Sequence, residues 1–447
     1  MKRNILLMTV DALRFDRIGL SGYRYDTSPV LDKLSKNSIW CENTYSLAPS
    51  TQPSMPVIMT STRPLSYGGY DLGVKNRPNV LPKVLKDNGY ATNHLITFPW
   101  LRPTYGYCVG VDAVEHLYNI TGIVGATVHT IRSDVISYQE EKLDSKIMMK
   151  WVGPLIKQCF DDLDEYSNHR LNIGVLEKDY FKYSAFSHQG YNYDVVKDVV
   201  QKHRVEFEFD PLSYINKYIV GLPKQSAHFW ISKEIKYKIK FRHLTKYFFR
   251  AIFHYNQKLK ISFSHKNKIY VDASELTNKL ISDIYNFAQS KREKPFYLWT
   301  HYMDTHAPYC PGELPNWPKN AKKYLKRVGY SEDLDLFLAC NGKLEKDNNQ
   351  EVLNARYDSC VRYTDEQIGR VIDALDETGL LNDTLVVIAG DHGEELGEHG
   401  EYGHRFRFYD ECTHVPMFFY NPSFKEKKIS GLTDLSDLAP TILDLVG

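Results

Sequence analysis

Short apolar runs that end at an acidic residue are the clearest pattern in this 447-residue chain. Ile5 to Val10 is apolar apart from Thr9 and leads to Asp11, and Leu385 to Ile388 leads through Ala389 and Gly390 to Asp391-His392. Apolar runs of this kind, about four to eight residues long, are typical of strands buried on both faces. Because ligands bind at the carboxyl ends of strands in open α/β sheets, both strand ends are candidates for a site.

Other apolar positions recur at helical spacing. From Leu353 to Leu375, apolar and aromatic residues follow a period close to 3.6 with acidic residues between them, which predicts a long amphipathic helix. The pattern predicts two more strands, at 295–299 and 415–420, and two more helices, from Pro29 to about residue 37 and at 438–446. This alternation is typical of an α/β fold with a doubly wound, mostly parallel sheet and helices on both faces.

A hydroxyl group stands where another helix is predicted to begin. Thr51 precedes a short segment whose residues Val57 to Met59 would form the buried side of that helix. Thr is favoured just before a helix, so Thr51 could be no more than an N-cap. The functional alternative is a hydroxyl at a helix N-terminus that favours anions. A metal ion held by the two strand-end carboxylates and His392 would make that hydroxyl a nucleophile.

Six blocks of sequence follow one another along the chain and cover about residues 3–112 and 270–447. They are TVDALRFDRIGLSGYRYDTSPVLDKLS, APSTQPSMPVIMTS, KPFYLWTHYMDTHAPY, YDSCVRYTDEQIGRVIDALDETGLLNDTLVVIAGDHGEELGEHG, YDECTHVPMFFYNP and TDLSDLAPTILDLVG. In this order they resemble the alkaline phosphatase superfamily, in its sulfatase-like hydrolase and transferase branch. The resemblance implies a metal-dependent enzyme acting on phosphoric or sulfuric esters.

Departures from the sulfatase pattern favour phosphoryl chemistry. Sulfatases carry a Cys or Ser, any residue, and then Pro-Ser-Arg, and that Cys or Ser is converted to formylglycine. Here Thr51 occupies the first position and Met55 replaces the Arg. Thr cannot form the aldehyde by the same route, because its β-carbon carries a methyl group. In addition, Ala12 follows Asp11 where sulfatases have a second acidic ligand.

The remaining candidate ligands resemble the single-metal site of lipoteichoic acid synthases and phosphoethanolamine transferases, the branch that uses a Thr nucleophile. They are Asp11, Thr51, Asp391 and His392. Their mixed oxygen and nitrogen atoms favour one divalent ion, Mn²⁺ or Zn²⁺, with Ca²⁺ or Mg²⁺ as alternatives. A second ion, held by Asp304, His306 and His404, is less favoured.

Further polar residues receive roles from the same resemblance. His306 matches a His that contacts substrate oxygens or protonates the leaving group, and His404 lies where relatives have a Lys or His near the leaving-group oxygen. With Thr51, these two are the predicted catalytic residues. Arg14 could contact substrate anions or simply pair with Asp16. Substrate binding is predicted for three residues, Arg14, His301 and Asp304.

The resemblance stops between residues 117 and 270. We therefore predict one sulfatase-like catalytic domain, 1–447, with a core formed by 3–116 and 271–447 and a large helical or irregular insert at 117–270. An insert at this place commonly covers the active-site cleft, so it is a predicted lid or substrate-specificity region. Residues 233–260 mix basic and aromatic residues, which favours an amphipathic helix packed on the core over one that binds an anionic polymer or membrane surface.

Composition limits the classes of partner. The net charge of +1 gives no reason to expect nucleic-acid binding, and no apolar run reaches the about 18 residues of a membrane span. No signal peptide is evident, and the 7 Cys residues include no CxxC pair. We expect a cytoplasmic protein that acts on an anionic ester substrate, for example one with a glycan or lipid head group.

Three functional hypotheses follow. The leading one is a metal-dependent hydrolase or transferase that cleaves a phosphate, or a related sulfate or phosphonate, ester through a covalent Thr51 intermediate. The alternative enzyme is a sulfatase that works without formylglycine. The third hypothesis is a catalytically degenerate binding or scaffold protein, which would have no need to retain Thr51 together with Asp11 and Asp391-His392.

Overall fold

The protein forms two compact units in the computed structural model: Met1–Leu117 with Ser264–Gly447, and Tyr118–Phe263. The structure describes residues 2–118, 120–173, 193–220, 230–232, 234–235, 270–290, 294–307, 309, 317–330, 350–404 and 407–447. The predicted insert contains the second unit. The amphipathic helix predicted within 233–260 lies almost wholly outside the described residues, and the lid role of the insert stays a prediction.

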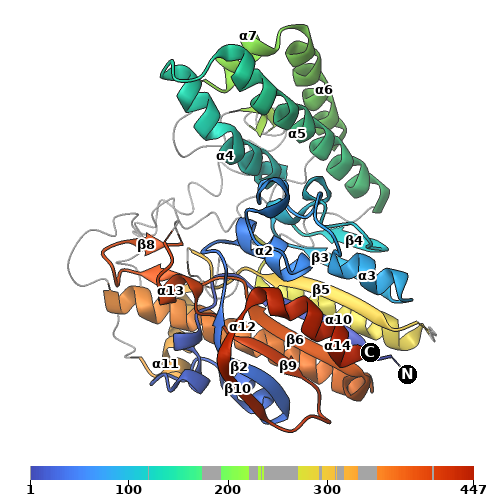
Figure 1. Ribbon diagram of the computed structural model, residues 1–447, viewed down its shortest axis with the longest axis vertical. Helices are drawn as coiled ribbons and strands as arrows, with labels where there is room; N and C mark the ends of the chain where they lie inside the picture. Colours follow the sequence, from blue (N-terminus) through green and yellow to red (C-terminus); the bar gives the residue numbers. More distant parts are fainter. Residues whose placement is uncertain are drawn as a thin grey trace, which may run out of the picture. The chain divides into compact units, whose positions relative to one another are not determined.

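An eight-stranded sheet forms the centre of the first unit (Figure 1). Its order is β10-β2-β9-β6-β1-β5-β3-β4, and β9 runs antiparallel to both of its neighbours while the other pairings are parallel. This mostly parallel sheet confirms the predicted fold class. The strands are β1 (Asn4–Val10), β2 (Ser38–Tyr45), β3 (Ala91–Ile96), β4 (Ala113–His116), β5 (Phe296–Tyr302), β6 (Thr384–Gly390), β9 (Met417–Tyr420) and β10 (Lys427–Asp434).

The three central strands end together at one edge of the sheet. β1 lies between β5 and β6, and its last residue, Val10, pairs with Tyr302 on one side and with Gly390 on the other. All residues of β5 and β6 are buried, as expected for strands covered on both faces. β5 is longer than predicted, because its backbone pairing with β1 continues through the polar residues Thr300 and His301.

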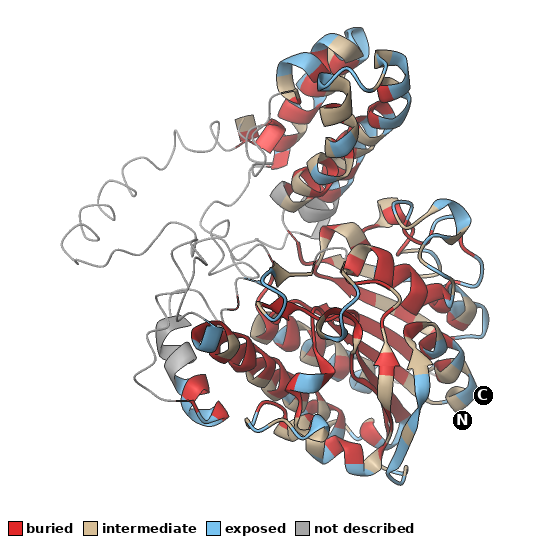
Figure 2. Ribbon diagram, turned by 60° about the vertical axis from the view of Figure 1, so that its left-hand side comes forward, coloured by how far each residue is buried: buried red, intermediate tan, exposed pale blue. Residues whose placement is uncertain are grey.

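Two groups of helices pack with the sheet. In one, α1 (Pro29–Leu34), α10 (Ala273–Gln289) and α11 (Trp317–Val328) contact α12 (Gln350–Glu377), which is the predicted amphipathic helix. In the other, α2 (Thr51–Thr60) contacts α3 (Leu81–Asp87) and α14 (Leu438–Val446). Figure 2 shows buried residues concentrated in the sheet and in the helices on it. Short elements complete the unit: β7 (Glu395–Leu396), β8 (Tyr402–Gly403) and α13 (Asp410–Thr413).

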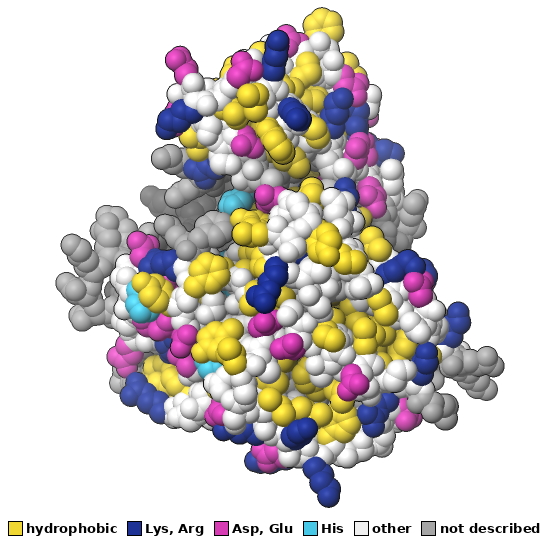
Figure 3. Space-filling view, in the orientation of Figure 1, with side chains coloured by type: hydrophobic (Ala, Val, Ile, Leu, Met, Phe, Trp, Pro, Cys, Tyr) yellow, Lys and Arg dark blue, Asp and Glu magenta, His cyan; other side chains and the backbone are white. Residues whose placement is uncertain are grey.

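The described part of the second unit is helical. It contains α4 (Ile120–Gln139), α5 (Ser145–Ile173), α6 (Tyr193–Phe209) and α7 (Pro211–Tyr218). α4 packs on α5, and Phe160 of α5 contacts Phe207 of α6 and Tyr214 of α7. None of the helices in the described parts of the chain has the length and hydropathy needed to cross a bilayer. On the face drawn in Figure 3, Lys and Arg are interspersed with Asp and Glu, in keeping with the net charge of +1.

The stability of the first unit should depend on its central strand. Leu6 in β1 is fully buried, so Leu6→Ala should lower the free energy of unfolding by about 2–5 kcal/mol through lost burial and a cavity. Leu432→Ala in β10, where the side chain is 80% exposed, is the matched control and should change it by less than about 0.5 kcal/mol. Denaturant unfolding of both variants measures the difference. Equal losses would contradict the assignment of β1 to the core.

Candidate active site

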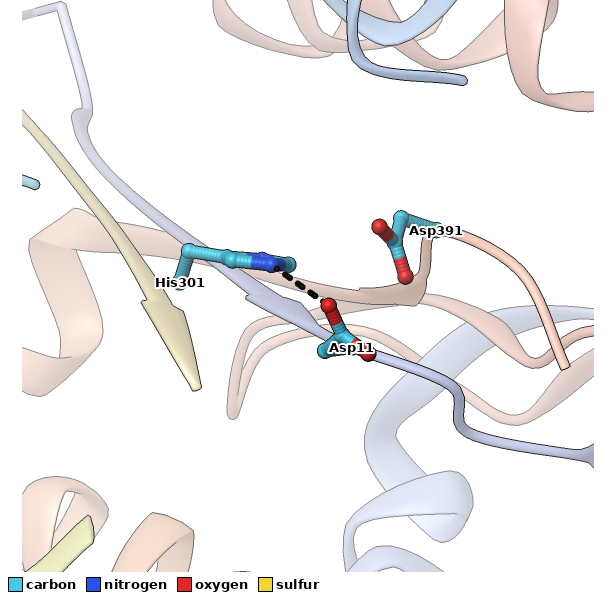
Figure 4. Close-up of side chains that lie close together, drawn as sticks. All are labelled: Asp11, His301 and Asp391. Atoms are coloured by element: carbon cyan, nitrogen blue, oxygen red, sulfur yellow. Dashed lines mark ion pairs between the residues drawn. The ribbon is translucent and has the colours of Figure 1, made fainter. Parts of the chain in front are cut away.

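Three side chains that could hold a metal ion meet at the ends of the central strands. Asp11 directly follows β1, Asp391 directly follows β6, and His301 lies near the end of β5. Figure 4 shows the His301 ring turned toward Asp11, with the Asp391 carboxylate close by. The Nε2 atom of His301 is 3.4 Å from Asp11 Oδ2, and one ligand atom from each residue lies within 4.8 Å of the others. All three residues are fully buried.

Thr51 and His392 complete this cluster. The Thr51 hydroxyl donates a hydrogen bond of 2.8 Å to Asp11 Oδ2 and lies 3.1 Å from His392 Nε2. That Nε2 atom is 3.6 Å from Asp391 Oδ2. The structure therefore brings the four predicted metal ligands together. Thr51 is not an N-cap, because Ser50 precedes α2 and the Thr51 hydroxyl bonds to the cluster.

Backbone contacts fix the orientation of His392. Its Nδ1 atom lies 2.8 Å from the carbonyl oxygen of Gly393, so an Nδ1–H can donate there and leave the Nε2 lone pair facing the cluster. Gly393 allows the close chain approach that this turn requires, since a Cβ there would lie 2.0 Å from the carbonyl oxygen of Glu411. These contacts place the Nε2 atom of His392 beside the Asp391 carboxylate.

His301 is held from the neighbouring strand. The hydroxyl of Thr9 lies 2.9 Å from His301 Nδ1 and accepts a hydrogen bond from the Trp299 indole at 3.1 Å. These contacts direct Nε2 toward Asp11. Sequence reasoning assigned His301 to substrate binding, whereas the structure places it in the cluster that could hold a metal ion. The only sequence signal for this position was its proximity to the end of a predicted strand.

The donor atoms of the cluster fit a divalent cation. Asp391 Oδ1 accepts hydrogen bonds from the backbone N–H groups of Ala12 and His392, at 3.2 and 2.9 Å. Its Oδ2 atom and Asp11 Oδ1 are buried, and neither has a hydrogen-bond partner among the described residues. Burying carboxylate oxygens without a partner is costly, so two of them converging with imidazole nitrogens is the arrangement expected around a cation.

The proton affinities of the cluster agree with this fit. Burial favours the neutral acid, but the surrounding imidazoles, His306 foremost, hold the pKa of Asp11 well below its usual range. Burial and the charge of Asp11 raise the pKa of Asp391 to about 7. Burial, with the nearby His404, lowers the pKa of His392 to about 3, so its imidazole is neutral at neutral pH, as a metal ligand must be.

His404 and His306 lie beside the cluster. The ring centroid of His404 is 4.4 Å from that of His392 and 5.0 Å from that of His306. Nδ1 of His404 lies 3.0 Å from the buried carboxylate of Glu394. Burial alone would lower the pKa of His404, but Glu394 outweighs it and raises this pKa to about 9. His404 is therefore a cation at neutral pH. The sequence analysis did not predict the contact between His404 and Glu394, although Glu394 follows closely after Asp391-His392 in the sequence.

The other two predicted substrate-binding residues, Arg14 and Asp304, are also buried. Arg14 is 2% exposed, and its guanidinium donates to Asp16 at 2.8 and 2.6 Å and to Glu398 at 2.6 Å. Arg14 therefore pairs with Asp16, as one of the two alternatives expected, and its contact with a substrate anion stays a prediction. Asp304 is fully buried just beyond β5.

Comparison with known proteins identifies the family. The family model described as Sulfatase matches residues 3–137 and 214–447. The chain belongs to the sulfatase family. Over 470 residues it is 23% identical to an arylsulfatase of Clostridium perfringens (strain 13 / Type A), covering 99% of this chain and 75% of that protein. The chain thus spans about three quarters of the length of this relative.

Solved structures share the fold. A phosphonate monoester hydrolase from Silicibacter pomeroyi is similar with a TM-score of 0.51 and 18% identity, covering 100% of this chain and 73% of that one. The lipoteichoic acid synthase LtaP from Listeria monocytogenes gives a TM-score of 0.51 and 15% identity, covering 100% and 72%. At such identities the likeness shows the fold alone. The predicted superfamily is confirmed, and the protein is an ester hydrolase of the sulfatase family.

Metal binding by this sulfatase-family protein should depend on Asp391. Asp391→Asn removes a negative charge from the cluster. Changes to residues that only orient a ligand typically weaken metal binding by about 10–100-fold, and the loss of Asp391 should weaken it by more than that. Elemental analysis of gel-filtered protein measures the retained ion. Asp383→Asn, at the exposed start of the same strand region, is the control and should retain it. Full metal content in Asp391→Asn would contradict the assignment.

Proposed function

We propose that this protein cleaves a phosphate ester, or a related phosphonate or sulfate ester, by a metal-dependent reaction with Thr51 as the nucleophile. The observation that carries the proposal is the place of the Thr51 hydroxyl. It is buried at the first residue of α2, 2.8 Å from Asp11 Oδ2 and 3.1 Å from His392 Nε2. A side chain that only stabilised a helix would not be expected to lie this close to two of the proposed metal ligands.

Four residues would hold one divalent ion, and His301 offers a further nitrogen. The donor set of carboxylates, imidazole and hydroxyl favours Mn²⁺ or Zn²⁺, with Ca²⁺ or Mg²⁺ as alternatives. When bound, the ion supplies positive charge that lowers the pKa of the hydroxyl and offsets the charge of the ester. The four proposed ligands are Asp11, Thr51, Asp391 and His392.

The proton movements of a double displacement can be assigned to named groups. The proton of the Thr51 hydroxyl, which is hydrogen-bonded to Asp11 Oδ2, would leave to water as Oγ1 bonds to phosphorus, because the lowered pKa of Asp11 makes that carboxylate too weak a base to keep it. The bond from phosphorus to the leaving oxygen breaks, and cationic His404 is placed to donate a proton to that oxygen. Water would then release the phosphoryl group from Thr51 in a hydrolase, and an acceptor alcohol would do so in a transferase.

Phosphorus esters are favoured over sulfate esters by two residues. Thr51 cannot become formylglycine by the known route, and Met55, which replaces the Arg of the sulfatase motif, is fully buried. Two proteins of the same fold, a phosphonate monoester hydrolase and a lipoteichoic acid synthase, are in keeping with this preference. The substrate would be an anionic ester, such as one with a glycan or lipid head group.

The runner-up function is a sulfatase that works without formylglycine. The observation that supports it is the similarity to the arylsulfatase of Clostridium perfringens, which extends over 99% of this chain. Nitrophenyl phosphate, bis-nitrophenyl phosphate, nitrophenyl phenylphosphonate and nitrophenyl sulfate share one leaving group and separate the two functions. We expect the highest kcat/KM on a phosphorus ester. Preference for the sulfate would instead support the sulfatase.

Loss of the hydroxyl should abolish turnover without unfolding the protein. Thr51→Ala removes one buried hydrogen bond, worth about 1 kcal/mol, but it also removes the nucleophile, so kcat should fall by at least on the order of 10³-fold. Thr51→Ser keeps a hydroxyl and should retain part of the activity. The measurement is kcat on the best ester, together with mass spectrometry of rapidly quenched protein for a phosphorylated Thr51 peptide.

A second threonine of the same helix provides the control. Thr60 is buried at the other end of α2, where its hydroxyl donates to the carbonyl oxygen of Pro56. Thr60→Ala should therefore cost similar stability and leave kcat within a few-fold of the wild type. Near-equal turnover of Thr51→Ala and Thr60→Ala would show that another group attacks the ester.

A further inference from the structure

A tyrosine of α12 bridges the backbone that follows Asp11. Tyr357 is fully buried, and its hydroxyl donates a hydrogen bond of 2.6 Å to the carbonyl oxygen of Ala12. The same hydroxyl accepts a hydrogen bond of 3.0 Å from the backbone N–H of Arg14. One hydroxyl group therefore satisfies both a buried acceptor and a buried donor of the turn after β1.

The backbone to which the Tyr357 hydroxyl bonds is in an unfavourable conformation at Ala12. Ala12 has a φ of 54°, in the left-handed region that residues other than glycine rarely adopt. Such a conformation persists only where surrounding contacts impose it, and it is found preferentially at functional sites. Ala12 is fully buried, and the Tyr357 hydroxyl supplies a contact of this kind at its carbonyl group.

This conformation has a direct consequence for the cluster. The backbone N–H of Ala12 donates to Asp391 Oδ1 at 3.2 Å, and the backbone N–H of His392 donates to the same oxygen at 2.9 Å. The two donors fix the carboxylate so that Oδ2 lies 3.6 Å from His392 Nε2. A rotation of the Ala12 backbone would remove one of the two donors and free the carboxylate to turn.

We propose that Tyr357 is a positioning residue of the metal centre, which acts by holding Ala12 in the conformation that orients Asp391. Tyr357 neither ligates the ion nor contacts the ester; its effect reaches Asp391 through the backbone of Ala12. The inference rests on the metal centre of the proposed function, but it is independent of whether Thr51 is the nucleophile.

Removal of this single hydroxyl isolates the effect. Tyr357→Phe keeps the ring, which packs edge-on against Tyr309 with centroids 5.7 Å apart. It leaves the carbonyl oxygen of Ala12 and the N–H of Arg14 without this partner. Tyr363→Phe is the matched control, because Tyr363 is buried on the same helix and its hydroxyl donates to Asp272, which is not part of the cluster.

The test is the affinity of metal-free protein for Mn²⁺ and Zn²⁺, measured by calorimetric titration of the wild type and both variants. Tyr357→Phe should bind about 10–100-fold more weakly, the range found when residues that orient a ligand are changed. Tyr363→Phe should bind as the wild type does. Excess metal should restore most of the kcat of Tyr357→Phe with an unchanged KM, which a general loss of structure would not allow.

A further variant tests the route through Ala12. Glycine adopts a positive φ without the steric penalty of a Cβ, so Tyr357→Phe should weaken metal binding less in an Ala12→Gly background. Equal losses in both backgrounds would contradict transmission through Ala12. Wild-type affinity in Tyr357→Phe, or a loss no greater than in Tyr363→Phe, would overturn the proposal. A wild type that binds no ion would instead overturn the proposed metal centre itself.

Discussion

Two carboxylates of like charge are buried at the ends of adjacent parallel strands. The rest of the site depends on how the repulsion between these two buried charges is offset. Asp11 and Asp391 are both fully buried, and burial, together with the repulsion between the two carboxylates, raises the pKa of Asp391 to about 7. Two such groups side by side are costly unless a cation or a proton offsets their charge. In this site the surrounding nitrogen and oxygen atoms are arranged to receive a cation.

The pairing of the central strands brings these carboxylates together. Because β1 pairs in parallel with both β5 and β6, the backbone register that aligns Val10 with Tyr302 and Gly390 also aligns the residues that follow. Hydrophobic burial of the three strands therefore determines the spacing of Asp11, His301 and Asp391. The start of α2 then brings the Thr51 hydroxyl to the same edge.

Local sequence patterns were sufficient to predict much of this. Apolar runs located β1 and β6, and the motifs after them identified Asp11, Thr51 and the Asp391-His392 pair, which the structure brings together. The position of His301 was harder to predict. A polar residue usually ends an apolar run, whereas here backbone pairing with β1 carries β5 through it.

Contacts between distant segments could not be predicted from local patterns. The Tyr357 hydroxyl meets Ala12 across 345 positions of sequence, and the periodicity of α12 marks its buried face without showing which of its residues reaches the turn after β1. The pairing of His404 with Glu394 likewise depends on how the chain folds back after β6. Such contacts follow from the packing of whole elements, so they become visible only in the folded structure.

The most direct test of the account is a crystal structure of metal-loaded protein with anomalous scattering recorded at the absorption edge of the bound ion. The account predicts one peak at the carboxyl edge of the sheet, with oxygen or nitrogen atoms of Asp11, Asp391 and His392 about 2.0–2.2 Å from it. A peak held by other residues, or none between these three side chains, would contradict it.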